Sequence, residues 1–513
     1  MEAGAVKMML GVVLSAVLLT GVFIRGAASP DTALAEGGSG FSLTTAALVS
    51  SVVPAPNSAS GGAEDPIVLT LSEALDASSF NAESFSVFGR WSGVASGRVT
   101  LEAGGTRIRF EPDQAFHAGE AVTASLNRDV RTAAGESLPT GYTWTFWIQS
   151  GPGSLDMVEL GSVTTLQEGE EHTQPYGGYA GDFNSDGYPD IAIPNEVSGD
   201  VRVMMNDGAG NYSDFTVLDI PSGTYPSPNE GADFNGDGIT DFAVGNAGND
   251  VVAVFMGRGD GGFHVASSYH AGTNVRGLCI MDLNLDGSPD IATANMTGGV
   301  EPNRGTISMM INDGAGNFTD ITTIPSPGRG EKTCATGDAN EDGILDLFVG
   351  AFNSDEMLVY LGDGNGGLEF KSKVPTRGRT WMIVSGDMNG DGHVDLISAN
   401  RQTSSAAVFF GDGEGNLSEP VQYKIGEDPL AIDVGDIDGD GDLDVVSSDK
   451  AGDSFTIYEN AGDGTLIRPR TLLSGKAGSC AIIHDRDRDG DLDITGVDET
   501  ADLIFLFENP GPG

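Results

Sequence analysis

The sequence is poor in cysteine, histidine and basic residues. Its 513 residues include three Cys, six His and 26 Lys and Arg, against 75 Asp and Glu, so the formal net charge is −49. Phosphate binding needs clustered positive charge, and its scarcity here argues against nucleic acid as a partner. Because the number of cysteines is odd, Cys279, Cys334 and Cys480 are predicted to be buried thiols rather than a disulfide framework.

Long apolar runs are also missing, apart from one near the N-terminus. The 17 residues from Met8 to Ile24 follow Lys7, and the small-residue segment Ala33-Leu34-Ala35 comes after them. A membrane-spanning helix needs about 20 such residues, so this run is short for one. We interpret residues 1 to 35 as a cleaved export signal, with a retained N-terminal anchor as the alternative. The protein is therefore expected at the cell surface or outside the cell.

Residues 36 to 53 are rich in Gly, Ser and Ala and are predicted to be a linker. From 54 to 149, short alternating segments are separated by turn residues, which is typical of a β-sandwich. Strands are expected at 67–71, 85–88, 98–101, 107–110, 121–126 and 142–148. Trp91, Trp144 and Trp147 are expected in the core, with a sugar-binding platform as the alternative.

Several motifs in this segment point to a known domain. They are Val53-Pro54-Ala55-Pro56, Leu71-Ser72-Glu73-Ala74-Leu75-Asp76, Arg109-Phe110-Glu111-Pro112, Ala134-Gly135-Glu136-Ser137-Leu138 and Trp144-Thr145-Phe146. With these motifs, residues 54 to 149 resemble the bacterial Ig-like domain of surface-layer and adhesin proteins. The resemblance implies that this domain acts as a spacer or stalk.

The main feature of the chain is a nine-residue segment that occurs seven times. The copies follow one another at intervals of 49 to 56 residues, and each has oxygen-bearing side chains at positions 1, 3, 5 and 9 and Gly at position 6. Ca²⁺ takes six to eight oxygen ligands, which such a loop supplies from alternate side chains, one backbone carbonyl and a final carboxylate. The predicted ligands, with position 7 acting through its carbonyl, are Asp182, Asn184, Asp186, Tyr188, Asp190; Asp233, Asn235, Asp237, Ile239, Asp241; Asp282, Asn284, Asp286, Ser288, Asp290; Asp338, Asn340, Asp342, Ile344, Asp346; Asp387, Asn389, Asp391, His393, Asp395; Asp436, Asp438, Asp440, Asp442, Asp444; and Asp485, Asp487, Asp489, Asp491, Asp493.

Seven loops in register predict up to seven structural Ca²⁺ ions. Every side-chain position is supplied, so no open position is left for a substrate, as a catalytic metal requires. The loops hold 26 of the 75 acidic residues, and seven bound ions would change the net charge from −49 to −35. Metal-free surface turns are the alternative, because Asp, Asn and Gly also favour turns.

The repeat length predicts a propeller. About 49 residues per repeat fit four strands of roughly 12 residues each with their turns. The last repeat ends before its fourth strand, and residues 157 to 166 match the missing segment. We expect this N-terminal strand to complete the last blade and close the ring. The predicted fold is all-β, with an Ig-like sandwich at 54–149 and a seven-bladed propeller at 151–513.

The metal loops, with segments such as Leu347-Phe348-Val349-Gly350-Ala351, also carry a resemblance. Residues 153 to 513 are similar to the FG-GAP/VCBS repeat family, whose relatives include the propellers of integrin α-subunits. The resemblance implies calcium between the first and second strands of each blade. It places the usual ligand surface on the opposite face.

Ligand contacts are expected in the loops that join one blade to the next, which hold six of the 26 basic residues. Arginine forks beside aromatic rings suit an acidic glycan. Ion pairs with neighbouring acidic loops are the alternative. The candidate residues are Tyr176, Tyr225, Arg276, Arg329, Lys332, Arg377, Arg379, Trp381 and Lys476.

These features predict an exported calcium-binding protein whose propeller binds a polysaccharide or an extracellular protein. No catalytic residues are predicted, since the histidines are scattered in the sequence and the Asp-rich loops are assigned to metal. One alternative is a polysaccharide lyase or hydrolase, or an accessory subunit of such an enzyme. Another is a structural surface-layer component. New reducing ends in a polysaccharide would favour the enzyme, and self-assembly in calcium would favour the structural role.

Overall fold

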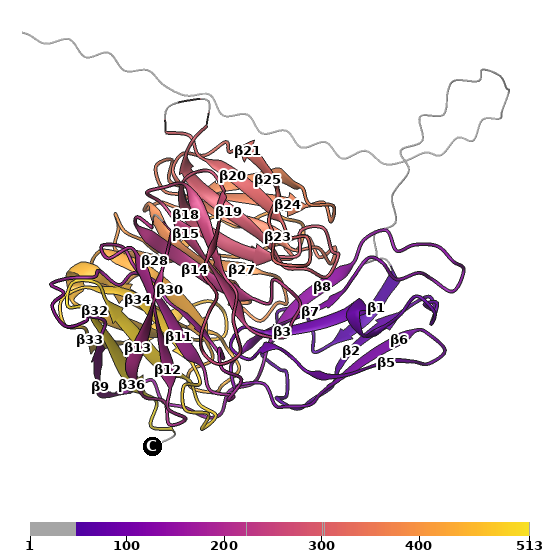
Figure 1. Cartoon of the computed structure of the whole chain (residues 1–513), viewed down its shortest axis with the longest axis horizontal. Coiled ribbons are helices and arrows are strands. Elements are labelled where there is room, and N and C mark those ends of the chain that lie inside the picture. The colour runs from indigo at the N-terminus through magenta and orange to yellow at the C-terminus, as the bar shows by residue number, and fades with distance from the viewer. Residues whose placement is uncertain (1–47, 222, 300, 302, 512–513) are drawn as a thin grey trace, which may run out of the picture. The chain divides into compact units, whose positions relative to one another are not determined.

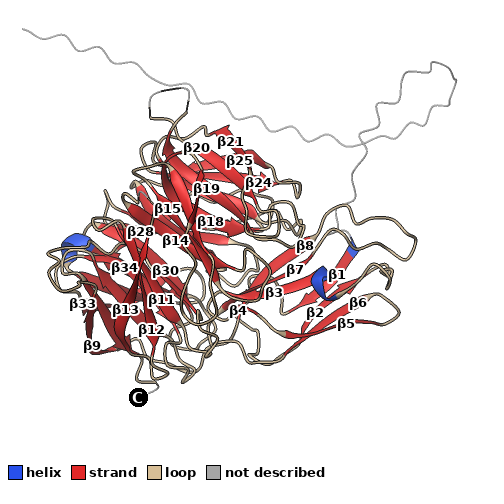
Figure 2. Cartoon of the chain, in the orientation of Figure 1, coloured by secondary structure: helices blue, strands red, loops and turns tan. Residues whose placement is uncertain are grey.

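The computed structural model describes residues 48–221, 223–299, 301 and 303–511 (Figure 1). The expected export signal, residues 1 to 35, lies outside them. Almost all regular structure in the described residues is β, with short 3₁₀ turns at Ala82–Ser84 and Lys450–Gly452 (Figure 2). No helix in the described part is long and apolar enough to cross a membrane.

Residues 49 to 147 form a sandwich of two four-stranded antiparallel sheets, β1-β2-β6-β5 and β4-β3-β7-β8. Alternate residues of the two inner faces, such as Leu69, Phe110, Val122 and Trp144, are buried between them. All six expected strands are present. The bounds are β1 Val49–Val53, β2 Ile67–Leu71, β3 Phe85–Gly89, β4 Gly93–Val94, β5 Gly97–Glu102, β6 Arg107–Pro112, β7 Ala121–Leu126 and β8 Tyr142–Trp147.

The predicted linker at 36–53 is wrong at its C-terminal end. Val49–Val53 forms β1, which pairs with β2 from Val53 opposite Val68 to Val49 opposite Leu71. Val49 and Val52 pack against the core of the sandwich, whereas Ser50, Ser51 and Val53 are exposed. The segment is a half-buried strand at the edge of the sheet.

Seven further four-stranded sheets follow, and we call them blades one to seven in chain order. The bounds are β10 Tyr179–Gly181, β11 Asp190–Asn195, β12 Asp200–Asn206, β13 Tyr212–Asp219; β14 Pro226–Ala232, β15 Asp241–Asn246, β16 Val251–Phe255, β17 Ser267–His270; β18 Thr273–Met281, β19 Asp290–Thr297, β20 Thr306–Ile311, β21 Asp320–Pro325; β22 Glu331–Gly337, β23 Asp346–Ala351, β24 Glu356–Gly362, β25 Leu368–Pro375; β26 Thr380–Gly386, β27 Asp395–Asn400, β28 Ser405–Phe409, β29 Val421–Lys424; β30 Pro429–Gly435, β31 Asp444–Asp449, β32 Ser454–Asn460, β33 Leu466–Leu473; and β34 Gly478–His484, β35 Asp493–Asp498, β36 Leu503–Glu508, β9 Val158–Thr164.

Blade seven combines the two ends of the repeat region. Its fourth strand is β9, which pairs with β36 from Val158 opposite Glu508 to Thr164 opposite Leu503. The prediction that an N-terminal strand completes the last blade is therefore confirmed. Blades one and seven also share one apolar core, in which Ile191 packs with Ile482 and Ile504. The ring is thus closed by strand pairing and by side-chain packing.

The burial pattern explains the order of strands in each blade. The second strands, such as β11 and β27, are buried along their whole length because neighbouring blades cover both faces. The fourth strands alternate between exposed and half-buried residues, as in β25, because they form the outer edge. These two patterns match the continuous apolar runs and the alternating runs in each repeat.

The sandwich packs directly on the propeller. Trp91 belongs to the same apolar core as Ile437 and Leu492 of the propeller. Arg128 Nη1 donates hydrogen bonds of 3.1 Å to two propeller carbonyls, those of Asn284 and Gly364. Loop residues such as Arg128 and strand residues such as Trp147 of β8 both contribute to the interface, which a domain resemblance does not identify.

The tryptophans of the sandwich are core residues, as predicted. Trp91, Trp144 and Trp147 are 3%, 2% and 9% exposed. Trp144 packs inside the sandwich, whereas Trp147 joins a core cluster of the propeller with Met388 and Leu443. With so little ring surface exposed, a sugar platform made of these residues is excluded.

The prediction for the cysteines holds only for Cys480, which is a buried free thiol. Cys279 and Cys334 form a disulfide, with Cα atoms 6.2 Å apart. The two residues lie on β18 and β22, the innermost strands of blades three and four. The packing of successive blades brings these strands side by side, which cysteine counting cannot reveal.

Candidate functional site

The seven Asp-rich loops occupy the same place in every blade, between the first and second strands. In blade one, β10 ends at Gly181 and β11 begins at Asp190, the position 9 residue. Asp190 Oδ2 accepts the N–H of Phe183 at 3.0 Å, and its Oδ1 accepts the N–H of Asn206 at 2.8 Å. The corresponding aspartates of blades two to six accept the same two hydrogen bonds. Position 9 therefore ties each loop to its blade.

Position 1 holds the turn of the loop. Asp182 Oδ2 accepts the N–H of Gly187 at 2.9 Å, and Gly187 has a φ of +85°, which favours glycine. Position 1 accepts the same bond in blades two to six. At position 3, the Asn184 amide donates to Asp186 Oδ2 at 2.9 Å. These bonds hold the carboxylates in one place.

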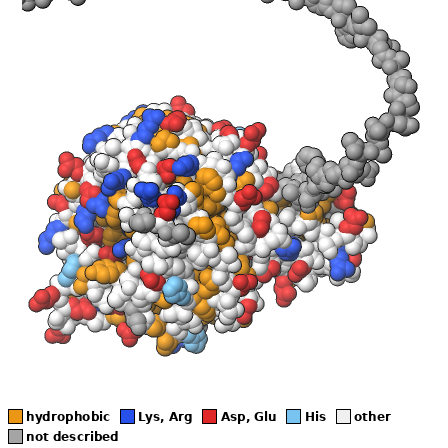
Figure 3. Space-filling model, turned by 90° about the horizontal axis from the view of Figure 1, so that it is seen from above, with side chains coloured by type: hydrophobic (Ala, Val, Ile, Leu, Met, Phe, Trp, Pro, Cys, Tyr) orange, Lys and Arg blue, Asp and Glu red, His pale blue; other side chains and the backbone are white. Residues whose placement is uncertain are grey.

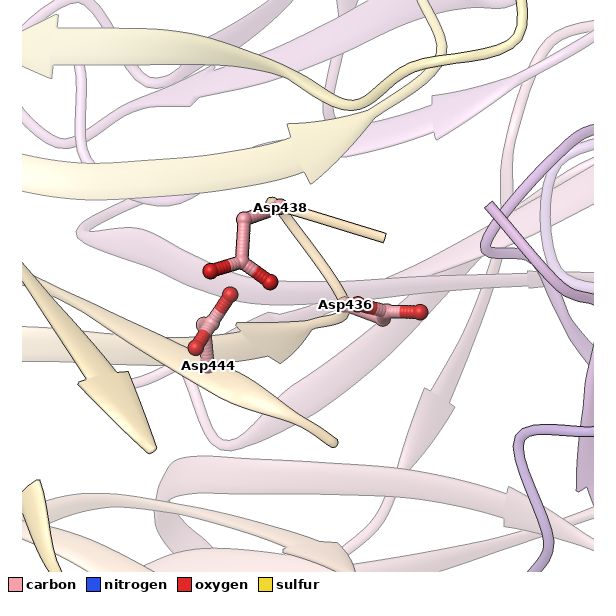
Figure 4. Close-up of side chains that lie close together, drawn as sticks. All are labelled: Asp436, Asp438 and Asp444. Atoms are coloured by element: carbon pink, nitrogen blue, oxygen red, sulfur yellow. The ribbon is translucent and has the colours of Figure 1, made fainter. Parts of the chain in front are cut away.

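The loop of blade six fits a hard cation well. One carboxylate oxygen each from Asp436, Asp438 and Asp444 lies within 4.8 Å of the others, and Asp438 and Asp444 point toward one another (Figure 4). Asp436 Oδ1 and Asp438 Oδ1 are buried without a hydrogen-bond partner. Burial raises the pKa of Asp444 to about 8. An oxygen-only set with unpaired carboxylate oxygens is the donor set that Ca²⁺ prefers.

The loops are not equivalent, although the sequence motif is. Among the described residues, three acidic groups come this close only in the loops of blades six and seven, where position 3 is Asp438 or Asp487 rather than Asn. In blade seven, the fully buried Arg486 lies 2.6 Å from Glu508 and 3.4 Å from Asp493. Arg486 stands at position 2, which is apolar in the other loops, and it places a positive charge beside a predicted ligand.

On the opposite face, four of the nine predicted ligand residues meet at the end of the central channel. Tyr176, Arg276, Lys332 and Trp381 come from blades one, three, four and five and line the same cavity. Trp381 Nε1 donates a hydrogen bond to the hydroxyl of Tyr176, which joins blades one and five across the channel. Lys332 Nζ lies 3.9 Å from the centroid of the Trp381 ring.

Arg401 belongs to this group and was missed by the sequence analysis. Its Cζ lies 4.1 Å from the centroid of the Trp381 ring, so two cations cover that indole. Arg401 lies between the second and third strands of blade five, whereas ligand contacts were expected in the loops between blades. Because Lys332 and Arg401 occupy the ring, Trp381 is not an open stacking surface.

The electrostatics of the group centre on Lys332, which is 4% exposed. Burial, and then the nearby Arg276, hold the pKa of Lys332 well below its usual range. Arg276 forms an ion pair with Glu196 at 2.8 Å, and Arg401 forms one with Asp428 at 2.5 Å. Lys332 has no ion pair with any described residue.

The other five predicted ligand residues lie outside the channel. Arg377 forms an exposed ion pair with Glu419 at 2.5 Å, which is the alternative considered for the basic loops. Arg379 lies over the ring of Phe352, with Cζ 5.5 Å from its centroid. The remaining three, Arg329, Lys476 and Tyr225, are exposed. Figure 3 shows Lys and Arg side chains gathered on one part of the propeller surface.

The cavity has a volume of about 1200 Å³ and is lined by residues from all seven blades. Its other end is lined by the sandwich sheet β4-β3-β7-β8. There Arg90 extends toward Asp433 of blade six, with Nη1 and Oδ1 3.5 Å apart, and its carbonyl accepts the Tyr179 hydroxyl at 2.9 Å. The Ig-like domain thus forms one wall of the cavity.

Two of the histidines that are far apart in the sequence also meet in the structure. The rings of His117 and His484 each lie 6.3 Å from the ring of Trp91. Burial lowers the pKa of His117 to about 4, and it holds that of His484 well below its usual range. Both rings are therefore neutral near pH 7 and belong to the packing between the two domains.

The repeats match a known family model. Its description is FG-GAP-like repeat, and the matched residues are 182–244, 233–293, 282–349, 338–398 and 387–447. The chain belongs to the FG-GAP-like repeat family. The matches cover the first six Asp-rich loops of this FG-GAP-like propeller but not the loop of blade seven, the one that contains Arg486. A model for a bacterial Ig-like domain matches residues 43–147.

Similarity of this FG-GAP-like protein to solved structures is distant. A lectin of Agrocybe aegerita that recognises non-reducing terminal N-acetylglucosamine is 16% identical, with 84% of this chain and 97% of that chain covered and a TM-score of 0.40. An auxiliary nutrient binding protein from Bacteroides ovatus is 13% identical (90% and 97%; TM-score 0.39). A periplasmic gluconolactonase of Pseudomonas aeruginosa is 14% identical (80% and 98%; TM-score 0.40). No curated protein matches the sequence.

Proposed function

We propose that this protein is an exported, calcium-stabilised recognition protein. Its propeller binds an extracellular glycan or protein on the face opposite the Asp-rich loops. One observation carries this proposal: Tyr176, Arg276, Lys332 and Trp381 come from four blades and converge at one end of a 1200 Å³ cavity. Convergence of polar and aromatic groups on a large cavity is typical of a binding site.

Calcium has a structural role in this proposal. The loop carboxylates would hold the ion, with Asp436, Asp438 and Asp444 as the best-formed set. When bound, the ion neutralises carboxylates that burial keeps close together. Because the ion binds the folded state, its binding free energy adds to the stability of the fold.

Export is supported by two features of the chain. The Cys279–Cys334 disulfide is typical of proteins that fold in an oxidising compartment. Calcium is also more abundant outside the cell, where sites of modest affinity are filled. Both features agree with the apolar N-terminal segment that we interpret as an export signal.

Binding of the mature protein to an array of acidic and neutral polysaccharides and extracellular proteins, in calcium and at two salt concentrations, tests the proposal. We expect at least one class of probe to bind, and Trp381→Ala to weaken that binding at least tenfold. Absence of binding to every probe would contradict the proposal. New reducing ends after incubation with a polysaccharide would instead support the alternative of a polysaccharide-degrading enzyme.

The exposed residues Arg377 and Arg379, which we call the rim, are tested separately from the channel. Arg377→Ala/Arg379→Ala removes two basic residues of the rim. Arg468→Ala/Arg470→Ala is its matched control, because it removes an equally spaced pair from β33, an outer strand of blade six. Loss of binding in the first variant alone would extend the binding surface to the rim. Equal binding by both variants would limit it to the channel.

A further inference from the structure

Of the cations Arg276, Lys332 and Arg401, Lys332 alone has no carboxylate partner among the described residues. The two others, Arg276 and Arg401, are each paired, with Glu196 and Asp428 respectively. Lys332 is also the least exposed of the three, at 4%. The structure therefore places a lysine side chain without an acidic partner in the wall of a cavity.

A buried lysine without an acidic partner is costly. Removing an ammonium group from water carries a large penalty unless an opposite charge or several hydrogen bonds replace the solvent. The Trp381 ring at 3.9 Å offsets part of this cost through a cation–π contact. A ligand carboxylate would offset more of it, because it brings the missing negative charge.

We propose that Lys332 binds the carboxylate of an acidic sugar, that is, a uronic acid unit of a glycan that enters the channel. This inference rests on the proposed function and names the class of ligand. The ammonium group supplies a single positive charge, which matches one carboxylate per sugar unit. The cavity of about 1200 Å³ exceeds the 300–1000 Å³ of common small-molecule sites and holds an oligosaccharide.

The cavity that Lys332 lines also carries polar side chains. Ser227, Asn229, Thr333 and Ser479 line the same cavity. Their oxygens, together with backbone groups of the inner strands, supply hydrogen-bonding partners for sugar hydroxyls. The faces of Trp381 are covered by Lys332 and Arg401, so charge rather than ring stacking decides which sugar binds at this end.

The experiment measures binding of a trigalacturonate, its methyl ester and a neutral trisaccharide to the mature protein in calcium by isothermal titration calorimetry. Esterification removes the charges and keeps the sugar rings. We expect the acid to bind at least tenfold more tightly than the ester. This comparison uses the unmodified protein, so it does not depend on the folding of any variant.

Variants then assign the preference to one residue. Lys332→Met keeps an unbranched apolar chain beside Trp381 and removes the charge, and we expect it to lose at least tenfold in affinity for the acid but not for the ester. Lys371→Met is the matched control, since Lys371 is an exposed lysine on β25, the outer strand of the same blade. It should bind the acid as the unmodified protein does.

Each outcome decides a different question. Binding of the ester or the neutral sugar as tightly as the acid overturns this inference and leaves the proposed function standing. A preference for the acid that survives Lys332→Met also overturns it, because another cation then provides the charge. No binding of any of the three sugars rejects Lys332 as a uronate site, while the array still tests the proposed function with protein probes.

Discussion

Arg90 of the Ig-like domain and Asp433 of blade six form an ion pair of 3.5 Å at the wall of the central cavity. The Asp433 side chain is 5% exposed, and its Oδ2 accepts the N–H of Ile483 at 3.0 Å. A carboxylate in this position needs its positive partner, since little water reaches it. The pair therefore joins the Ig-like domain to the propeller, and it supplies the positive charge that the buried Asp433 carboxylate needs.

Arg90→Met should accordingly destabilise the whole protein. The expected loss is about 2 kcal/mol in the free energy of unfolding, because a buried carboxylate loses a charged partner. Urea unfolding followed by fluorescence measures it. Arg98→Met is the control, as Arg98 pairs with Glu111 on the exposed surface of the sandwich. An equal loss in the free energy of unfolding for the two variants would show that the Arg90–Asp433 pair contributes no more than an exposed ion pair.

Lys332→Met should stabilise the protein in the absence of ligand. Burial and then Arg276 lower the pKa of Lys332, whereas the pKa in the unfolded chain is about 10.4. At pH values between the folded-state pKa and the unfolded-state pKa of Lys332, the unfolded state binds more protons. The free energy of unfolding of the wild type therefore rises with pH in that range. The Lys332→Met variant does not bury an amino group. We expect its free energy of unfolding near pH 7 to exceed that of the wild type by about 1 kcal/mol, with the loss of the cation–π contact already subtracted.

Unfolding measurements from pH 6 to pH 10 test this expectation. The advantage of Lys332→Met should shrink as the pH approaches 10. The neighbouring charges are Arg276, Glu196 and Arg401, which lie in the ion pairs Arg276–Glu196 and Arg401–Asp428. A variant that is less stable than the wild type at every pH would show that the ammonium group is favourable where it lies.

Local patterns in the sequence predicted the parts of the fold that repeat. Oxygen-bearing residues at alternate positions, with Gly at position 6, identified all seven loops. The length of the repeat, such as the interval between Asp387 and Asp436, predicted four strands per blade. The structure places each loop between the first and second strands, as the resemblance implied. These features depend on residues close in the chain, so a sequence alone reveals them.

Apart from the strand that completes blade seven, contacts between distant segments were not predicted. Cys279 and Cys334 are 55 residues apart, and the packing of successive blades brings β18 next to β22. Arg90 and Trp91 reach the propeller from a domain expected to be a spacer. Lys332 was one of six basic residues predicted to contact a ligand. Its burial and its lack of an acidic partner depend on how three other blades pack around it. Such properties follow from packing and have no local signal.

Asp438→Asn should weaken calcium binding at the loop of blade six. The change gives position 3 the amide found in blades one to five and removes one of three close carboxylates. We expect about a tenfold lower affinity at one site, because ligand charge tunes the affinity of such loops. In chelator the variant should be slightly more stable than the wild type, since repulsion among the carboxylates falls. Calorimetric titration with calcium, followed by melting curves in chelator, measures both effects.

The matched control is Asp442→Asn, which changes position 7 of the same loop, where only the backbone carbonyl is a predicted ligand. It should leave calcium affinity within about twofold, because no predicted ligand is lost. Identical melting curves with calcium and with chelator for the wild type would contradict occupied loops altogether.

The Cys279–Cys334 disulfide should stabilise the ring between blades three and four. It closes a loop with a sequence separation of 55, and disulfides of this kind contribute about 2–4 kcal/mol. Cys279→Ser/Cys334→Ser should therefore unfold at a lower urea concentration, and reductant should destabilise the wild type but not this variant. Cys480→Ser controls for placing a hydroxyl in the core, because Cys480 is a buried free thiol. Thiol titration of the unfolded, unreduced wild type should give one thiol per chain; three would show that the bond does not form.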